Sequence, residues 1–127
     1  MNPAILVAAE KVDHAPGIKN GKDFLLNLRV LLQKTGAQVL TEEPVAYDFG
    51  GSQFFRDDYA IEAAPGIRVI QSFFARIING YAVVFAFIGE DQKSVDEMAK
   101  AMETFAPIRK SVTTILEPPP KPTPKPK

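Results

Sequence analysis

The fold of this chain is decided by residues 67–89, which read IRVIQSFFARIINGYAVVFAFIG. Two apolar runs, residues 67–78 and 81–89, flank Asn79-Gly80 in this stretch. That dipeptide is typical of the two-residue type I′ turn of a β-hairpin, because both central residues of the turn need a positive φ. The sequence therefore predicts two antiparallel strands whose register is fixed by the turn.

The side chains of this hairpin alternate between two faces, and neither face is polar. The register pairs Phe74 with Phe85 on one face and Ala75 with Val84 on the other. A hairpin with one face in water would carry polar residues there, so each face needs a cover. The face with the smaller residues is expected to let its cover approach more closely.

Two amphipathic helices can supply these covers. Residues 21–35 follow the candidate N-cap Asn20 and place five apolar residues at helical spacing, namely Phe24, Leu25, Leu28, Leu31 and Leu32. Residues 91–105 carry a second stripe, formed by Val95, Met98, Ala99, Met102 and Phe105. Ser94 and Glu97 fit a capping box at its start, and Asp91 is a competing cap. The predicted fold class is α+β, an α/β/α sandwich in which an antiparallel meander sheet is covered by one helix on each face.

The remaining segments complete one domain, predicted to span residues 1–117. A buried strand is expected at residues 4–9, and further strands at 38–40, 45–49 and 52–62. Gly50-Gly51 is expected to be a bulge or tight turn. Residues 108–116 read as a short strand or an irregular segment. Residues 118–127, PPPKPTPKPK, are predicted to be a disordered tail or an extended linker, with a Pro-x-x-Pro ligand as the alternative.

Composition excludes several classes of function. The chain has 15 basic and 15 acidic residues, and three of its lysines lie in the tail, so residues 1–117 carry 15 − 3 = 12 basic against 15 acidic groups. This mildly acidic body argues against nucleic acid as the main partner. The absence of cysteine excludes disulfides and thiolate metal sites. No apolar stretch approaches the roughly 20 residues of a membrane span.

The order of the predicted elements resembles the PsbP-like superfamily, which includes the P-subunit of the photosystem II oxygen-evolving complex and a eukaryotic Ran-release factor. The resemblance covers about residues 5–106. It is carried by residues 23–32, FGGS at 49–52, residues 68–74, NGY at 79–81, and residues 83–87 and 95–105. The chain departs from that pattern because it has no tryptophan and lacks the usual N-terminal hairpin. The resemblance implies an α/β/α fold and a bacterial extracytoplasmic protein, periplasmic or secreted, whose targeting segment is not in this chain. It assigns no functional residue.

The densest mixture of charged and aromatic residues is FFRDDY at residues 54–59. Alternation along a strand places Arg56 and Asp58 on one face, and Asp57 and Tyr59 on the other. The same strand pairing would bring Arg76 close to them. These five residues are the candidate ligand-binding or partner-binding site, either a polar pocket or a patch at the end of the sheet. The alternative interpretation is cross-strand ion pairing on an edge strand.

No catalytic constellation is recognisable elsewhere. His14 is the only histidine, and its polar surroundings predict an exposed loop residue. Asp48, Asp57, Asp58 and Glu62 could meet around a hard cation, but their spacing does not resemble a calcium-binding loop. No catalytic residue, metal site or cofactor is therefore predicted.

These observations favour a non-enzymatic interaction or accessory domain with an unknown protein partner. A monomer or weak homodimer is expected, without a membrane span and without nucleic acid. The alternative is a small-ligand-binding or enzymatic domain that uses the polar cluster at Arg56, Asp57, Asp58, Tyr59 and Arg76.

Overall fold

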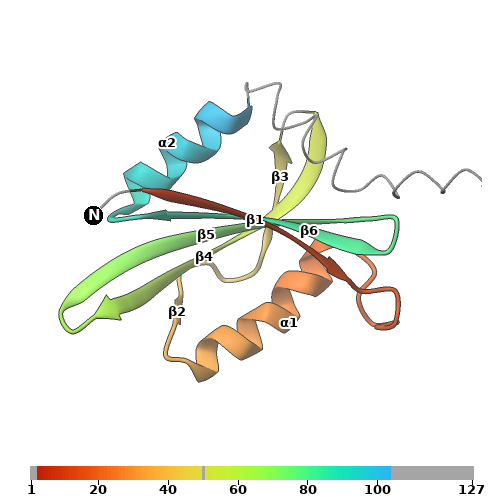
Figure 1. Cartoon of the computed structure of the whole chain (residues 1–127), viewed down its shortest axis with the longest axis horizontal. Helices are drawn as coiled ribbons and strands as arrows, with labels where there is room; N and C mark the ends of the chain where they lie inside the picture. Colours follow the sequence, from red (N-terminus) through yellow and green to blue (C-terminus); the bar gives the residue numbers. More distant parts are fainter. Residues whose placement is uncertain (1–2, 50, 104–127) are drawn as a thin grey trace, which may run out of the picture.

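The computed structural model of the chain describes residues 3–49 and 51–103. In these ranges six strands and two helices follow one another, namely β1 (Ala4–Lys11), α1 (Gly21–Lys34), β2 (Gln38–Val39), β3 (Val45–Phe49), β4 (Ser52–Ala64), β5 (Ile67–Ile78), β6 (Tyr81–Gly89) and α2 (Gln92–Glu103) (Figure 1). The predicted mixed α+β fold with an antiparallel sheet is confirmed. The predictions for residues 104–127, including the segment at 108–116 and the proline-rich tail, lie outside the described residues.

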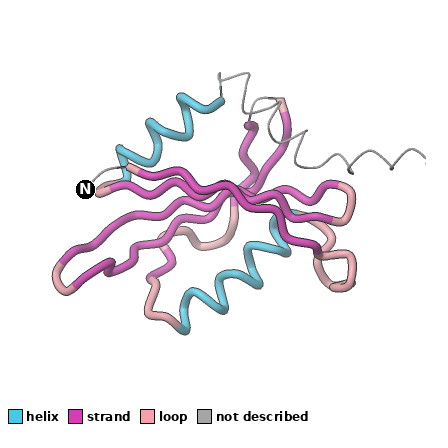
Figure 2. Tube along the Cα trace, in the orientation of Figure 1, coloured by secondary structure: helices cyan, strands magenta, loops and turns pink. Residues whose placement is uncertain are grey.

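All strands join one antiparallel sheet. Its order is β1-β6-β5-β4-β2, and β3 also pairs with β4. The three longest strands, β4, β5 and β6, form a meander that runs through the middle of the molecule (Figure 2). β1 therefore lies at one edge of the sheet, and the short strands β2 and β3 lie at the other.

The turn between β5 and β6 has the predicted conformation. Asn79 has a φ of 50° and Gly80 a φ of 79°. Phe74 is paired with Phe85 and Ala75 with Val84, as the two-residue turn requires. The predicted register is thus confirmed over the whole hairpin.

Two apolar clusters use alternate residues of this hairpin. The phenylalanine cluster joins strand residues to Val95 and Ala99 of α2, and its buried members are Phe49, Phe54, Phe74, Val83, Phe85, Phe87, Val95 and Ala99. The α1 cluster contains smaller strand residues, and its buried members are Val12, Phe24, Leu25, Ala75, Ala82 and Val84. Most of the apolar stripe that the sequence indicated is therefore buried in α1, where Phe24 and Leu25 lie in the α1 cluster, but Leu31 is 60% exposed and its predicted burial is wrong. In α2 Val95 and Ala99 are buried in the phenylalanine cluster, whereas Phe105 lies outside the described residues.

The beginning of α1 lies directly on the backbone of β5. A Cβ atom at Gly21 would lie 2.1 Å from the carbonyl oxygen of Ala75, which is far inside van der Waals contact. Only glycine therefore fits at this first position of the helix. The small side chains of the α1 cluster make this approach possible.

Each helix is capped by a side chain. Asn20 Oδ1 accepts a hydrogen bond of 2.9 Å from the Asp23 amide, which confirms the predicted cap of α1. At α2 the Ser94 amide donates to Asp91 Oδ1 at 2.8 Å. The competing cap Asp91 is thus the one used. The capping box that begins at Ser94 is wrong, because α2 already begins at Gln92 and Ser94 lies in its first turn.

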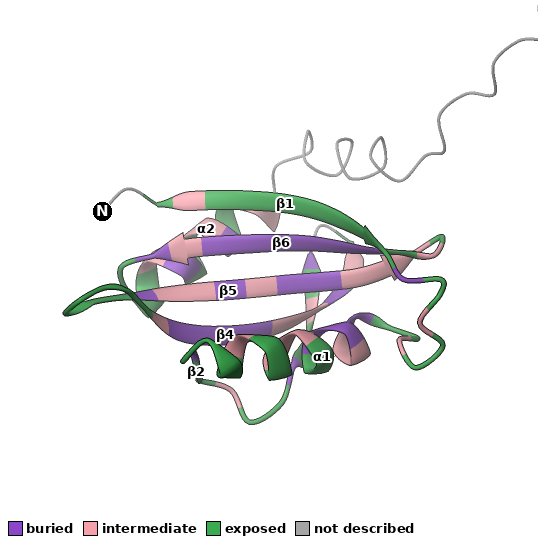
Figure 3. Ribbon diagram, turned by 60° about the horizontal axis from the view of Figure 1, so that its bottom comes forward, coloured by how far each residue is buried: buried purple, intermediate pink, exposed green. Residues whose placement is uncertain are grey.

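The prediction of a buried strand at residues 4–9 is half wrong. A strand is present and extends to Lys11, but its first three large side chains are exposed: Ile5 by 42%, Leu6 by 57% and Val7 by 46%. Figure 3 shows β1 along one edge of the sheet, exposed over all of its length except its beginning. A strand whose residues are all apolar is predicted to be covered on both faces of the sheet. β1 is an edge strand, and helices that pack over the middle of the sheet leave the side chains of an edge strand exposed.

Neither helix of the described part of the chain is long and apolar enough to cross a bilayer.

Candidate functional site

The charged residues of β4 lie inside the sheet rather than on its edge. β4 pairs with β5 along one side and with β3 and β2 along the other. Asp57 is fully buried and Asp58 is 6% exposed. The interpretation of this segment as an edge strand is therefore wrong, because β2 and β3 both add to its outer side. Two separate polar clusters result, one on each face of β4.

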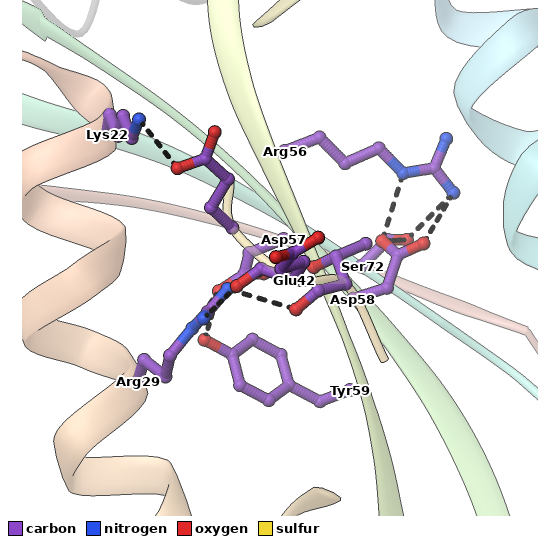
Figure 4. A network of polar contacts seen from close by, with 10 residues as sticks. Lys22, Arg29, Glu42, Arg56, Asp57, Asp58, Tyr59 and Ser72 are labelled. Atoms are coloured by element: carbon purple, nitrogen blue, oxygen red, sulfur yellow. Dashed lines mark hydrogen bonds and ion pairs between the residues drawn. The ribbon is translucent and has the colours of Figure 1, made fainter. Parts of the chain in front are cut away.

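The Asp57 cluster consists of Arg29, Thr41, Asp57 and Tyr59, of which Figure 4 labels Arg29, Asp57 and Tyr59. Arg29 of α1 holds the carboxylate with two hydrogen bonds, from Nη2 to Oδ1 at 2.8 Å and from Nε to Oδ2 at 3.1 Å. The hydroxyl groups of Thr41 and Tyr59 also donate to it. Arg29 further donates to the carbonyl oxygens of Thr41 and Glu42, so the connection between β2 and β3 is fixed to the same group.

Protonation in the Asp57 cluster is set by these contacts. The hydrogen bond to Asp57 raises the pKa of Arg29 and outweighs the opposing effect of burial. Burial is the main cause that raises the pKa of Tyr59, and its hydrogen bond to Asp57 adds to the effect. At neutral pH the arginine is therefore a cation and the phenol a neutral donor.

The Asp58 cluster consists of Arg56, Asp58, Ser72, Gln92 and Asp96. Arg56 Nε donates to Asp58 Oδ1 at 3.0 Å, and its Nη2 donates to the Ser72 hydroxyl at 3.1 Å and to Asp96. Asp58 also accepts hydrogen bonds from Ser72 and, at 3.0 Å, from Gln92 Nε2. Gln92 and Asp96 belong to α2, so this cluster fixes α2 to the sheet as the Asp57 cluster fixes α1.

Arg56 also contacts the phenylalanine cluster. Its guanidinium carbon lies 5.2 Å from the ring centroid of Phe74 and 5.7 Å from that of Tyr47. Burial lowers the pKa of Arg56, but hydrogen bonds to Asp58 and Asp96 outweigh it and the pKa is raised. The guanidinium therefore remains charged between an aromatic layer and two carboxylates.

The two clusters satisfy their own hydrogen-bonding groups. In the described part of the chain, no buried side-chain nitrogen or oxygen lacks a partner. One arginine neutralises Asp57, whereas Arg56 is shared between Asp58 and Asp96, whose side chain is 51% exposed. Such an arrangement stabilises the packing of the helices against the sheet.

The predicted site residues are thus divided. Arg56 and Asp58 lie together on one face, and Asp57 and Tyr59 on the other, in agreement with strand alternation. Arg76 lies on the neighbouring strand β5, paired with Val83 of β6, and it forms no ion pair with any side chain that the structure describes. The five residues do not meet at one place.

Sequence reasoning missed the partners from other elements, which are Arg29, Thr41, Gln92 and Asp96. A signal for one of them was present. Arg29 lies four residues after Leu25 and three before Leu32, so it interrupts the apolar stripe of α1 with a charge. A cation on the buried side of a helix indicates a buried anion opposite it.

The other candidate groups make local contacts. His14 is 76% exposed and lies 3.8 Å from Asp13, as expected for a loop residue. Asp48 and Glu62 each accept a hydrogen bond from a glycine amide in the adjoining turn, Gly51 and Gly66 respectively. Within residues 3–49 and 51–103 no group of three or more potential ligands could hold a metal ion.

The free edge of β1 is a second candidate site. Ile78 and Tyr81 flank the two-residue turn and pair with each other, so the peptide groups of Ala82 point away from β5 and toward β1. Ala82 is paired with Glu10, and the Val12 amide donates to the Gly80 carbonyl at 2.8 Å, which continues this alternation.

It follows that Leu6 and Ala8 direct their peptide groups at β6. The N–H and C=O groups of Ile5, Val7 and Ala9 point to the open side of the sheet. They can pair with a further strand.

A comparison of the sequence with protein-family models finds no match, and a comparison with curated proteins finds none either. The functional assignment therefore rests on the geometry of the two polar clusters and of the β1 edge.

Proposed function

We propose that this protein is a non-enzymatic interaction domain that binds an extended polypeptide strand along the free edge of β1. The observation that carries the proposal is that β1, an eight-residue strand, pairs on one side only with the strands that the structure describes. Its apolar side chains Ile5, Leu6 and Val7 are each about half exposed, between 42% and 57%. Natural sheets usually shield such an edge with charges, proline or a covering element, and an open one is a template for strand addition.

The polar clusters support a structural rather than a catalytic role for β4. The carboxylates of Asp57 and Asp58 each accept hydrogen bonds from an arginine and from a hydroxyl group. A ligand-binding or enzymatic function would require these groups and Arg76 to converge, but Asp57 and Asp58 lie on opposite faces of β4 and Arg76 lies on β5. The alternative function is for that reason not favoured.

We also propose that the domain is an α/β/α sandwich. Support comes from the two apolar clusters, which take alternate residues of β5 and β6 and include different helices. In Figure 1 the two helices are drawn on either side of the sheet. Nuclear Overhauser contacts test this arrangement: α1 protons should contact Ala82 but not Phe87, and α2 protons the reverse. Contacts of both helices with the same residue would contradict it.

The PsbP-like resemblance supports a bacterial extracytoplasmic location for such a domain. Fractionation of the source cells, followed by immunodetection of the chain, tests this part of the proposal. Recovery with periplasmic or secreted proteins is expected. Recovery only with cytoplasmic proteins would contradict it.

Site-specific photo-crosslinking tests the proposed strand binding. A diazirine amino acid replaces Val7 on the β1 edge or, as the control, Leu31 of α1, which is 60% exposed and apolar but lies on no sheet edge. Adducts with a polypeptide are expected from position 7 and should disappear when Ala9 is replaced by proline, which removes an outward N–H. Equal labelling from both positions would indicate unspecific hydrophobic contact and would refute the proposal, as would no adduct at all.

A further inference from the structure

We infer that the strand received by β1 is β1 of a second copy of this chain, paired antiparallel about a two-fold axis at Val7. This inference rests on the proposed function, because it names the partner of the same edge. Joining two six-stranded sheets in this way gives one continuous sheet of 6 + 6 = 12 strands.

The register follows from the direction of the peptide groups. In a two-fold antiparallel pair, the outward groups of Ile5, Val7 and Ala9 must meet the same groups of the partner. Placing Val7 opposite the partner's Val7 aligns Ile5 with the partner's Ala9. This register uses every outward peptide group between residues 5 and 9.

The side chains of β1 complement one another in that register. On one face the large Ile5 meets a small alanine, and on the other face Leu6 meets the partner's Ala8. Large residues opposite small ones can pack on both faces of the joint without displacing each other. Each exposed apolar side chain of β1 thereby gains a neighbour from the second copy.

The charges of β1 do not oppose this pairing. Residues 4–9 carry no charge, and Glu10 and Lys11 lie at the end of the strand. In the two-fold register, Glu10 meets the partner's Ala4, so like charges are not placed opposite each other. The charged residues at the end of β1 therefore do not prevent its pairing with β1 of a second copy.

Association should stop at two copies. The opposite edge of the sheet offers β2, which has two residues, and β3, which has five. Short edge strands are poor templates for strand addition. Because the β1 edge of each copy pairs with the β1 edge of the other, the assembly closes as a symmetric dimer and does not grow into a filament.

The dimer is weak and reversible. Each β1 contributes eight residues, whereas a stable interface of standard size uses roughly 20–30 residues from each partner. Pairing of this extent gives a concentration-dependent equilibrium in the micromolar to millimolar range.

Cysteine crosslinking tests the register, since the chain has no cysteine of its own. In the proposed dimer the two Val7 Cα atoms are about 5.5 Å apart, within the range of a disulfide. Residue 5 lies about 13 Å from its own copy, from four residues at about 3.3 Å each. With oxidised glutathione as oxidant, Val7→Cys should form covalent dimers and the control Ile5→Cys should remain monomeric. Equal crosslinking of both variants, or none of Val7→Cys, would overturn the inference.

Proline substitution tests the edge itself. The Val7 N–H points to the open side, so Val7→Pro leaves the pairing with β6 intact and blocks a second copy. Sedimentation velocity should show a mass rising above 13.9 kDa with concentration for the wild type and a constant monomer for Val7→Pro. Ala8→Pro is the matched control, since it removes a bond to β6 and should lower the stability of the fold. A wild type that stays monomeric at every concentration would overturn the inference.

Amide exchange of the wild type gives a readout that needs no variant. Raising the protein concentration should slow the exchange of the Ile5, Val7 and Ala9 amides and leave those of Leu6 and Ala8 unchanged. Failure of this inference remains distinguishable from failure of the proposed function. A monomeric protein that still gives Val7 adducts with another polypeptide retains the function and loses the self-pairing. A protein that forms Val7 adducts neither with a second copy nor with another polypeptide would contradict both the self-pairing and the proposed function.

Discussion

Replacing Arg29 by methionine tests how strongly the Asp57 cluster stabilises the fold. The side chain of Arg29 is 15% exposed and that of Asp57 is fully buried, so the substitution leaves a buried carboxylate without its cation. Breaking a buried pair from one side costs about 3–5 kcal/mol. The hydroxyls of Thr41 and Tyr59 still donate to the carboxylate, so the lower end of that range, about 3 kcal/mol, is expected.

Urea unfolding followed by circular dichroism measures this loss. With a slope of about 2 kcal/mol per M, the midpoint should fall by about 1.5 M. For a domain of about 100 residues, the melting temperature should fall by about 12 °C. Lys22→Met is the matched control, because its ion pair with Glu43 at 3.2 Å has side chains that are 35% and 66% exposed. That pair should contribute less than about 1 kcal/mol.

A double-mutant cycle separates the ion pair from the loss of packing. Asp57→Asn removes the charge and keeps the shape, so the double variant Arg29→Met/Asp57→Asn should lose at least about 1 kcal/mol less than the sum of the two single losses. Additive losses would refute the reasoning. So would an Arg29→Met variant that is no less stable than the Lys22→Met control.

Three further outcomes are expected. Gly21→Ala should destabilise the fold by more than about 2 kcal/mol in urea unfolding, because its Cβ would overlap the Ala75 carbonyl. The control Gly17→Ala should be nearly neutral, because its Cβ would meet nothing within 4 Å, and equal effects of the two variants would contradict the close approach. Phe85→Ala should cost about 3–5 kcal/mol, since its ring is 1% exposed in the phenylalanine cluster, and an unchanged melting temperature would contradict this burial. Burial raises the pKa of Tyr59 in the folded state, so its contribution to stability is fully present below the pKa of the unfolded phenol, about 10, and is lost as the pH rises through the folded value. The stability of Tyr59→Phe should thus fall less steeply above pH 10 than that of the wild type, and parallel curves of urea midpoint against pH would contradict the raised pKa.

The hairpin could be predicted completely because its information is local. The conformational demands of Asn79-Gly80 fix the turn, and the turn fixes every pair along β5 and β6. Alternation likewise predicted which of Arg56, Asp57, Asp58 and Tyr59 share a face. Neither inference depends on a segment distant in the sequence.

The predictions that failed depended on segments distant in the sequence. The partners of the two aspartates come from 28, 16 and 34 positions away, at Arg29, Thr41 and Gln92. Strand periodicity holds no information about them. The prediction that β1 is buried was wrong for a related reason, since the composition of a strand does not say how far two helices extend over the sheet. The cap of α2 could be narrowed only to two candidates, because Asp91 and Ser94 both suit a helix start and only the position of the first turn decides between them.

The charges inside β4 have a consequence for the chain before it folds. β5 and β6 are long and mostly apolar, the composition from which cross-β aggregates form. β4 is the longest strand, with 13 residues, yet it carries Arg56, Asp57 and Asp58 in its middle, where an intermolecular stack of like strands would bring equal charges together. In the folded domain Arg29 of α1 and Asp96 of α2 form ion pairs with Asp57 and Arg56, and Ser72 of β5 adds hydrogen bonds to Arg56 and Asp58. The same triplet thus discourages aggregation of the unfolded chain and fixes the helices in the native one.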